Sequence, residues 1–370
     1  MTVSGSLASG STTRNSAGAV AVWLLACCAM VFVMVVLGGV TRLTHAGLSI
    51  VEWQPLMGLI PPLSEPAWLD VFTKYQAYPE YQQLNHAMTL AEFKAIFWLE
   101  YFHRLWGRLI GAVFLVPFLY FLAKGQIERQ LRPHLALLFV LGGLQGLLGW
   151  YMVKSGLVDR PDVSQYRLAA HLAVAFAIYG YMFWLALGLI YGGAGHMTDK
   201  RAPAAAGRGA LLCALVFATA MIGAFVAGLD AGFAFNTFPL MNGSLIPEDF
   251  LALSPWYRNF FENVPAVQFA HRWLAIATFA LIVLFWAGAR TMTLPSPTRI
   301  FLHGLLLTAA LQVALGIATL LLVVPVPLAA LHQAGALALF TAALACTHRL
   351  RAAAGLVNFP SAPGFRSSSN

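Results

Sequence analysis

The sequence predicts an all-α polytopic membrane protein whose eight transmembrane helices form two pseudosymmetric four-helix bundles. Three observations lead to this prediction. The 370 residues are 59% hydrophobic and only 10% charged, with a mean hydropathy of +0.74. The apolar residues fall in eight long runs, and runs of roughly 20 apolar residues can span a bilayer. Landmarks of the first four runs also recur, in the same order, in the last four.

The spans and the segments between them follow from these runs. The expected spans are 18–40, 96–122, 135–153, 168–190, 210–229, 266–287, 300–324 and 328–347, of which the third is the shortest. Residues 1–17 are rich in Ser, Gly and Thr, which is typical of a disordered tail. The expected organisation is this tail, a first four-helix half at 18–191, an inner linker at 192–209, a second four-helix half at 210–350 and a tail at 351–370.

The distribution of charge predicts the orientation. With the N-terminus inside, the inner segments hold 12 of the 22 Lys and Arg residues, and only Glu128 and Asp199 of the 14 acids. The positive-inside rule therefore predicts that both termini lie on the cytoplasmic or matrix side. The same distribution explains the net charge of +8. No basic patch interleaved with aromatic residues indicates nucleic-acid binding.

An internal repeat connects the two halves. VTRLTHAG (40–47) aligns with FVAGLDAG (225–232) at an offset of 185, and FHR (102–104) aligns with AHR (270–272) at 168. GLQGLLG (143–149) aligns with ALQVALG (310–316) at 167, and AHL (170–172) aligns with LHQ (331–333) at 161. Apolar helices resemble one another by chance, but four landmarks in one order predict a parallel repeat.

Four histidines occupy matched positions near the starts of the second and fourth helices of each half: His103, His171, His271 and His332. Those two helices run in the same direction, so their imidazoles can approach one iron from opposite faces. Each histidine is followed one turn later by a small residue that leaves room for a flat porphyrin, namely Gly107, Ala175, Ala275 and Ala336. Small residues also let membrane helices pack closely. The pattern predicts two bis-histidine heme sites.

Two arginines, Arg104 and Arg272, directly follow the histidines of the second helices, at the outer helix mouths. A guanidinium there could hold a heme propionate bidentately. Anchoring of the helix at the membrane interface is an equal alternative.

The two halves differ at one position beside a histidine. Glu100 stands one turn before His103, and neutral Gln268 occupies the matching position. A carboxylate at a helix mouth could accept or relay protons or stabilise a developing cation; alternatively it pairs with Arg104 or Lys94. The asymmetry predicts that the first-half heme is a substrate and the second-half heme a cofactor.

Six segments together closely resemble the heme A synthase family in its alphaproteobacterial and mitochondrial type: GGVTRLTHAGLSIVEWQPLMGLIPP, EYFHRLWGRLIG, LAAHLAVAF, GLDAGFAFNTFPLMNG, QFAHRWLA and LHQAGALALF. The resemblance runs from about residue 35 to about residue 340. It implies oxidation of a ring methyl of heme O to a formyl group, which gives heme A for terminal oxidases, with heme b as the cofactor.

Carried over to this sequence, the resemblance implies that His271 and His332 ligate heme b and that His103 and His171 ligate heme O. Glu100 is the implied carboxylate that supports oxidation of the methyl. The expected reaction is two successive hydroxylations, after which the geminal diol loses water. The four electrons removed are expected to pass through the second-half heme. Some family members carry a cysteine pair in an outer loop, whereas 41–95 has no cysteine here.

The implied partners are heme O, membrane lipid, heme O synthase and cytochrome oxidase assembly factors; a homo-oligomer stays open and nucleic acid is not expected. The expected location is the bacterial inner (plasma) membrane rather than the mitochondrial inner membrane. Two other functions remain. A di-heme b-type cytochrome that takes electrons from quinol gives no reason for the Glu100 asymmetry. A transporter built on parallel repeats would need charges near the midplane, which these spans lack.

Overall fold

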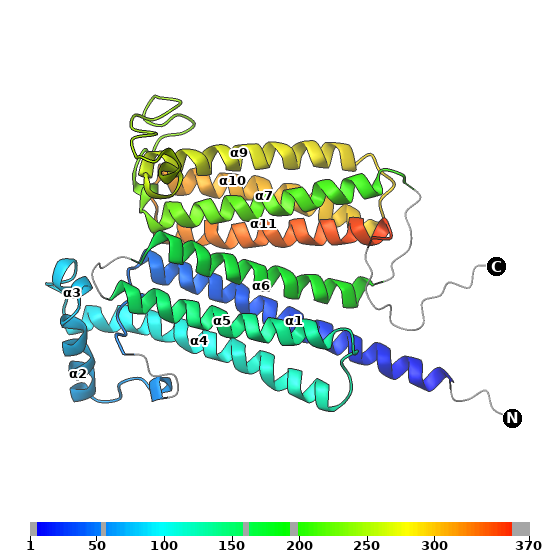
Figure 1. Cartoon of the computed structure of the whole chain (residues 1–370), viewed down its shortest axis with the longest axis horizontal. Coiled ribbons are helices and arrows are strands. Elements are labelled where there is room, and N and C mark those ends of the chain that lie inside the picture. Colours follow the sequence, from blue (N-terminus) through cyan, green and yellow to red (C-terminus); the bar gives the residue numbers. More distant parts are fainter. Residues whose placement is uncertain (1–5, 53–56, 158–162, 193–198, 357–370) are drawn as a thin grey trace.

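The computed structural model describes residues 6–52, 57–157, 163–192 and 199–356, and within these ranges it forms helices and no β-strand (Figure 1). Eight of the described helices are long and apolar enough to cross a membrane, which confirms the predicted all-α polytopic class and its eight spans. They are α1 (Ser6–Leu43), α4 (Leu90–Ala123), α5 (Arg132–Gly156), α6 (Gln165–Tyr191), α7 (Ala202–Gly228), α9 (Val264–Ala289), α10 (Ser296–Leu321) and α11 (Val326–Ala353).

The first helix begins earlier than expected. α1 starts at Ser6, within the expected tail at 1–17, and its apolar part suited to crossing the membrane is Ala17–Leu43. No proline interrupts the chain between these points, and extending an existing helix is far easier than nucleating one. Residues 1–5 of the expected tail lie outside the described residues.

The expected inner linker at 192–209 is also shorter than anticipated, because α7 begins within it at Ala202. A proline in the first turn and the alanines that follow it favour this start. At the other end of the second half, α11 continues to Ala353, beyond the expected boundary at 350. Residues 193–198 of the linker and 357–370 of the expected C-terminal tail are outside the described part of the chain.

The packing of the helices follows the same order in each half. In the first half α1 packs on α4, α4 on α5, α5 on α6 and α6 on α1. In the second half α7 packs on α9, α9 on α10, α10 on α11 and α11 on α7. Figure 1 shows the two groups as separate bundles, one above the other. This equivalence of neighbours supports the predicted repeat, and it places the second and fourth helices of each half on a diagonal.

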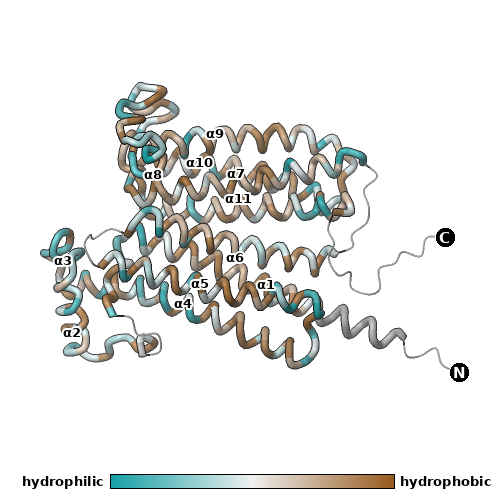
Figure 2. Tube along the Cα trace, in the orientation of Figure 1, coloured by the Kyte–Doolittle hydropathy of each residue, from teal (hydrophilic) through white to brown (hydrophobic). Residues whose placement is uncertain are grey.

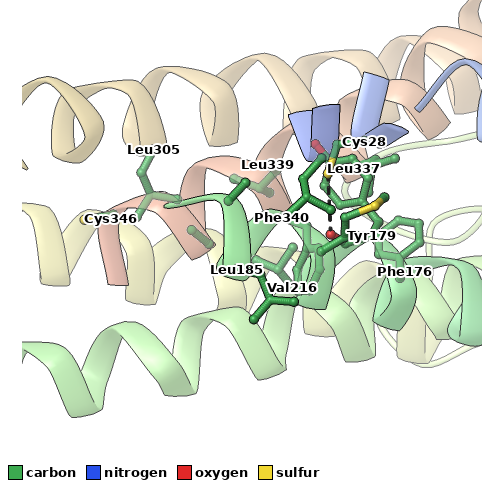
Figure 3. Packing of buried hydrophobic residues seen from close by; sticks show 14 of the residues in the cluster. Cys28, Phe176, Tyr179, Leu185, Val216, Leu305, Leu337, Leu339, Phe340 and Cys346 are labelled. Carbon is green, nitrogen blue, oxygen red and sulfur yellow. Dashed lines mark hydrogen bonds between the residues drawn. The ribbon is translucent and has the colours of Figure 1, made fainter. Parts of the chain in front are cut away.

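The two halves meet through α1 and α6 on one side and α7 and α11 on the other. Figure 3 shows the apolar side chains that fill this interface, among them Phe176 of α6 and Leu337 and Phe340 of α11. The Tyr179 hydroxyl and Thr341 Oγ1 lie 2.8 Å apart in a hydrogen bond across it. The polar pair is satisfied, and the apolar side chains around it are closely packed. These contacts hold the two halves against each other.

The lateral surface is apolar, and polar residues gather at the two ends of the bundles (Figure 2). Large apolar side chains such as Leu119, Val140 and Leu147 are more than half exposed, as expected of residues that face lipid. The start of α1 and the end of α11 lie at the same end of the molecule (Figure 1). Which end faces the cytoplasm stays a prediction.

Two short helices cover the opposite end of the first half. They are α2 (Glu65–Gln76) and α3 (Pro79–Gln83), which belong to the loop between α1 and α4. α2 begins after Ser64, whose side chain accepts a hydrogen bond from the Ala67 amide. Its buried aromatic residues pack against Phe93 and Phe97 of α4. This aromatic contact holds the start of α4, which carries the first candidate ligand.

Candidate functional site

The second-half histidines lie face to edge inside their bundle. The ring centroids of His271 on α9 and His332 on α11 are 6.4 Å apart, with the ring planes at 89°. Metal–imidazole bonds of about 2 Å on both sides of one ion place two ring centroids roughly 6.5 Å apart. The spacing therefore suits one iron between the two rings, held from opposite helices of the bundle.

The first-half histidines have a corresponding placement. His103 lies on α4 and His171 on α6, the second and fourth helices of the first half, which stand on the diagonal of that bundle. The Nδ1 atoms of His103, His171 and His332 are buried and have no hydrogen-bond partner among the described residues. Buried polar atoms usually have partners. A neutral imidazole has one unprotonated nitrogen that can bind a metal. Rings whose nitrogens are not occupied by protein hydrogen bonds therefore suit metal ligation.

A glycine on a neighbouring helix faces each of the four histidines. The pairs, with the distance from an ideal Cβ on the glycine to Cε1 of the histidine, are Gly38 and His103 (3.0 Å), Gly149 and His171 (3.1 Å), Gly223 and His271 (3.0 Å), and Gly316 and His332 (2.8 Å). The glycines lie on α1, α5, α7 and α10. Any larger residue would occupy space that the imidazole now fills.

Two glutamines hold the backbone at the fourth-helix histidines. Gln145 Nε2 donates to the His171 carbonyl oxygen at 2.9 Å, and Gln312 Nε2 donates to the His332 carbonyl oxygen at 3.0 Å. The two glutamines are related by the repeat offset of 167, and each lies one turn before a histidine-facing glycine. The sequence landmarks GLQGLLG and ALQVALG therefore each contribute a glutamine and a glycine to a histidine site.

Glu100 is buried, and both of its carboxylate oxygens accept hydrogen bonds. Its Oε1 accepts hydrogen bonds from Arg104 Nε (3.0 Å) and Nη2 (2.6 Å). Its Oε2 accepts hydrogen bonds from Ser49 Oγ (2.7 Å) and the Ile50 amide (2.8 Å). Arg104 also donates to the carbonyl oxygens of Ile50 and Glu52. The pairing of Glu100 with Arg104 rather than with Lys94 is therefore present in the structure.

The second half repeats this arrangement with a neutral residue. Gln268 is buried, and its Nε2 donates to the Ala231 carbonyl oxygen at 2.8 Å. Arg272 Nη2 donates to Gln268 Oε1 at 3.0 Å, and Arg272 also donates to the carbonyl oxygens of Phe235 and Thr237. The carbonyls held by the two arginines, 50 and 52 in one half and 235 and 237 in the other, are related by the repeat offset of 185.

These two clamps have a clear structural role. In each half an arginine and its partner one turn earlier fasten the loop that follows the first helix to the second helix. Both arginines therefore anchor the loop that follows the first helix of their half. The expectation that they hold heme propionates stays a prediction, as do the assigned roles of the four histidines and Glu100.

Sequence reasoning missed three parts of the site. Gly149, Gly316 and the two glutamines lie in segments that were recognised only as repeat landmarks, whereas Gly38 and Gly223 lie two residues before the landmarks at 40–47 and 225–232. The third part is a backbone contact, in which His271 Nδ1 lies 3.2 Å from the Thr219 carbonyl oxygen. No sequence pattern signals a carbonyl group. Pairing a glycine of one landmark with a histidine of another would have found Gly149 and Gly316.

The fold and these contacts define a polytopic helical membrane protein with a half-buried histidine pair in each of two bundles, suited to bis-histidine ligation of a porphyrin iron. Residues 21–344 match the family model of the cytochrome oxidase assembly protein family COX15-CtaA, and the chain belongs to this family. The structure thus agrees with the resemblance found in the sequence.

Curated relatives include bacterial and mitochondrial proteins. The chain is 55% identical to the heme A synthase of Nitrosospira multiformis over 332 residues, which cover 90% of this chain and 93% of the relative. It is 52% identical to the heme A synthase of Paramagnetospirillum magneticum over 90% of this chain and 93% of the relative. It is 49% identical to heme A synthase COX15 of Bos taurus over 89% of this chain and 81% of the relative.

Proposed function

We propose that this protein is a heme A synthase of a bacterial inner membrane, which oxidises a ring methyl of heme O to a formyl group. The observation that carries the proposal is the pair of matched histidine sites, one in each bundle, in a chain about half identical to proteins named heme A synthase. A single heme site would serve a simple electron carrier. Two sites allow one heme to be the substrate and the other the cofactor.

The second half is the cofactor half in this proposal. His271 is the one second-helix ligand whose Nδ1 has a backbone acceptor, the Thr219 carbonyl, among the described residues. Such a bond fixes the tautomer and orientation of a ligand and leaves Nε2 for the metal. A permanently bound heme benefits from a fixed ligand. His103 lacks this bond, which suits a site whose heme must enter as substrate and leave as product.

Within this assignment His271 and His332 would hold heme b, which supplies one-electron redox chemistry when bound. His103 and His171 would hold the iron of heme O and so place its ring in the first bundle. The methyl group would undergo two hydroxylations. With water as the oxygen source, each one adds a hydroxyl group and releases two protons and two electrons, which an external electron acceptor takes up. Loss of water from the resulting geminal diol leaves the formyl group, and four electrons have left the substrate.

We infer an electrostatic role for Glu100 rather than a role as a proton relay. Its two carboxylate oxygens already accept four hydrogen bonds, two of them from Arg104. A group that moves protons must exchange partners, whereas a fixed charge acts without reorganisation. Glu100 would stabilise positive charge that develops near the oxidised methyl. Gln268 leaves the cofactor half without this charge.

Other proteins would supply the heme O substrate and receive the heme A product. Heme O is the product of a heme O synthase, and heme A is the prosthetic group of terminal oxidases, so both a heme O synthase and oxidase assembly factors are expected partners. Both transfers involve an apolar, farnesylated molecule.

The test is pigment analysis after expression in a bacterium that makes heme O but has no heme A synthase of its own. Extracted hemes are separated and identified by mass. We expect heme A in cells that carry this chain and none in cells with the empty vector. Purified protein that contains only heme b, with heme O unchanged in aerobic cells, would contradict the proposal and favour a di-heme b-type cytochrome.

A further inference from the structure

The four histidine-facing glycines stand out because glycine is costly inside a helix. A helical glycine destabilises a protein by roughly 1 kcal/mol relative to alanine. None of the four has a backbone conformation that requires glycine, because all lie inside regular helices and none has a positive φ. A close approach is the remaining reason for glycine. In every case the approaching group is the imidazole of a candidate ligand.

Other glycines of these helices, such as Gly39, Gly209 and Gly228, also have close neighbours, but among the described glycines only Gly38, Gly149, Gly223 and Gly316 face the imidazole of a candidate ligand. Each of the four helices carries another glycine whose ideal Cβ has no described atom within 4 Å: Gly18 in α1, Gly146 in α5, Gly207 in α7 and Gly304 in α10. At the histidine-facing positions the Cβ would lie 2.8–3.1 Å from Cε1. Carbon atoms normally pack at about 3.5–4.0 Å. The ring, or the helix that carries it, would have to move.

The atom that is crowded matters chemically. Cε1 lies between the two ring nitrogens, so displacing it moves both Nδ1 and Nε2. In the second half, Gly223 lies one turn after Thr219 on the same face of α7. The absence of a side chain there lets the His271 ring reach the Thr219 carbonyl oxygen. The same displacement would therefore weaken the orienting hydrogen bond and tilt the metal-binding nitrogen.

We propose that Gly38, Gly149, Gly223 and Gly316 are positioning residues that set the rotation of the four imidazoles, and thereby the angle between the two ligand planes at each iron. This inference rests on the proposed heme ligation. In the second half the angle between the ring planes is 89°. The orientation of two axial imidazoles affects the electronic state and the reduction potential of a heme iron, because both depend on its ligands and their surroundings.

The experiment compares glycine-to-alanine variants of the full-length, heme-loaded protein with matched controls. Gly223→Ala is paired with Gly207→Ala, and Gly316→Ala with Gly304→Ala. Heme b per chain, the electron paramagnetic resonance g values of the low-spin ferric heme and its midpoint potential are measured. We expect the first member of each pair to hold no more than about one third of the heme b per chain that the unchanged protein holds, or to show shifted g values and a shifted midpoint potential. The controls should match the unchanged chain.

The first-half variants test the same idea at the substrate site. Gly38→Ala and Gly149→Ala should leave the heme b signals unchanged and weaken the binding of added heme O. Gly18→Ala and Gly146→Ala should bind heme O normally. If all four histidine-facing variants keep the heme content, g values, potential and heme O affinity of the unchanged chain, the positioning role is wrong.

A rescue separates ligand positioning from misfolding. His271→Gly is made with and without Gly223→Ala, and imidazole is added from solution. An untethered imidazole can shift away from the new methyl group, so both proteins should regain the low-spin signal. Failure of the double variant alone would point to a folding defect and contradict the inference.

If the unchanged chain holds bis-histidine heme b but makes no heme A, the proposed function fails while the glycine comparison still decides the inference. A chain without low-spin heme overturns both.

Discussion

Arg104 lies one helical turn after Glu100 and donates two hydrogen bonds to its carboxylate, at 3.0 and 2.6 Å. Arg272 holds neutral Gln268 one turn earlier in the second bundle, at 3.0 Å. The position of the clamp and its arginine are thus shared between the halves, whereas the charge and the other hydrogen-bond partners of the clamped residue differ.

Replacing Glu100 by Gln removes the charge and keeps the shape. We expect both hemes to stay bound and formyl formation to stop, because the fixed negative charge near the substrate is lost. The fold should lose about 1.5–3 kcal/mol, the usual range for a hydrogen bond to a charged partner. Glu92→Gln, which neutralises another acid in α4, is the control and should still yield heme A. Normal heme A in extracts of the Glu100→Gln strain would refute the catalytic role.

Variants of the two histidine pairs should differ in their absorption spectra. His271→Ala and His332→Ala each remove one of the two proposed heme b ligands, so the low-spin b-type spectrum of purified protein should disappear. His103→Ala and His171→Ala should retain that spectrum and lose bound heme O. The opposite pattern would mean that the substrate and cofactor halves are reversed.

Gln312→Leu should weaken heme b binding without abolishing it. The change removes the hydrogen bond to the His332 carbonyl oxygen, and such a bond contributes about 1 kcal/mol, or roughly fivefold in affinity. Titration of heme-free protein with heme b measures the effect. Gln145→Leu makes the equivalent change in the first half and should leave heme b affinity unaltered. Equal losses in the two variants would argue against independent sites.

Packing, rather than charge, should dominate the contact between the halves. Leu337 is fully buried there, and Leu337→Ala should lower the free energy of unfolding by about 2–5 kcal/mol. Arg42 forms an ion pair with Asp230, whose side chain is 47% exposed, so Arg42→Ala should cost about 1 kcal/mol or less. Denaturant unfolding in detergent compares the two. A larger loss from Arg42→Ala would show that electrostatics holds the halves together.

Much of this protein could be read from the sequence for a simple physical reason. A bilayer requires long apolar helices with internally satisfied backbones, so the eight spans are visible as composition alone. The repeat and the four histidines were visible because the two halves keep the same local sequence around matched positions. The start of α1 at Ser6 was missed, since a polar helical extension has no apolar signal.

The sequence by itself determined the membrane-spanning fold, the family and the histidines, because each depends on residue type and on spacing along one helix. Only the tertiary structure decided which groups on other helices meet those histidines: Gly223 beside His271, Gln312 on the His332 carbonyl, and the Thr219 carbonyl on Nδ1. Contacts between helices depend on helix rotation and on backbone atoms that every residue shares. Residue identity cannot specify these before the bundle is packed.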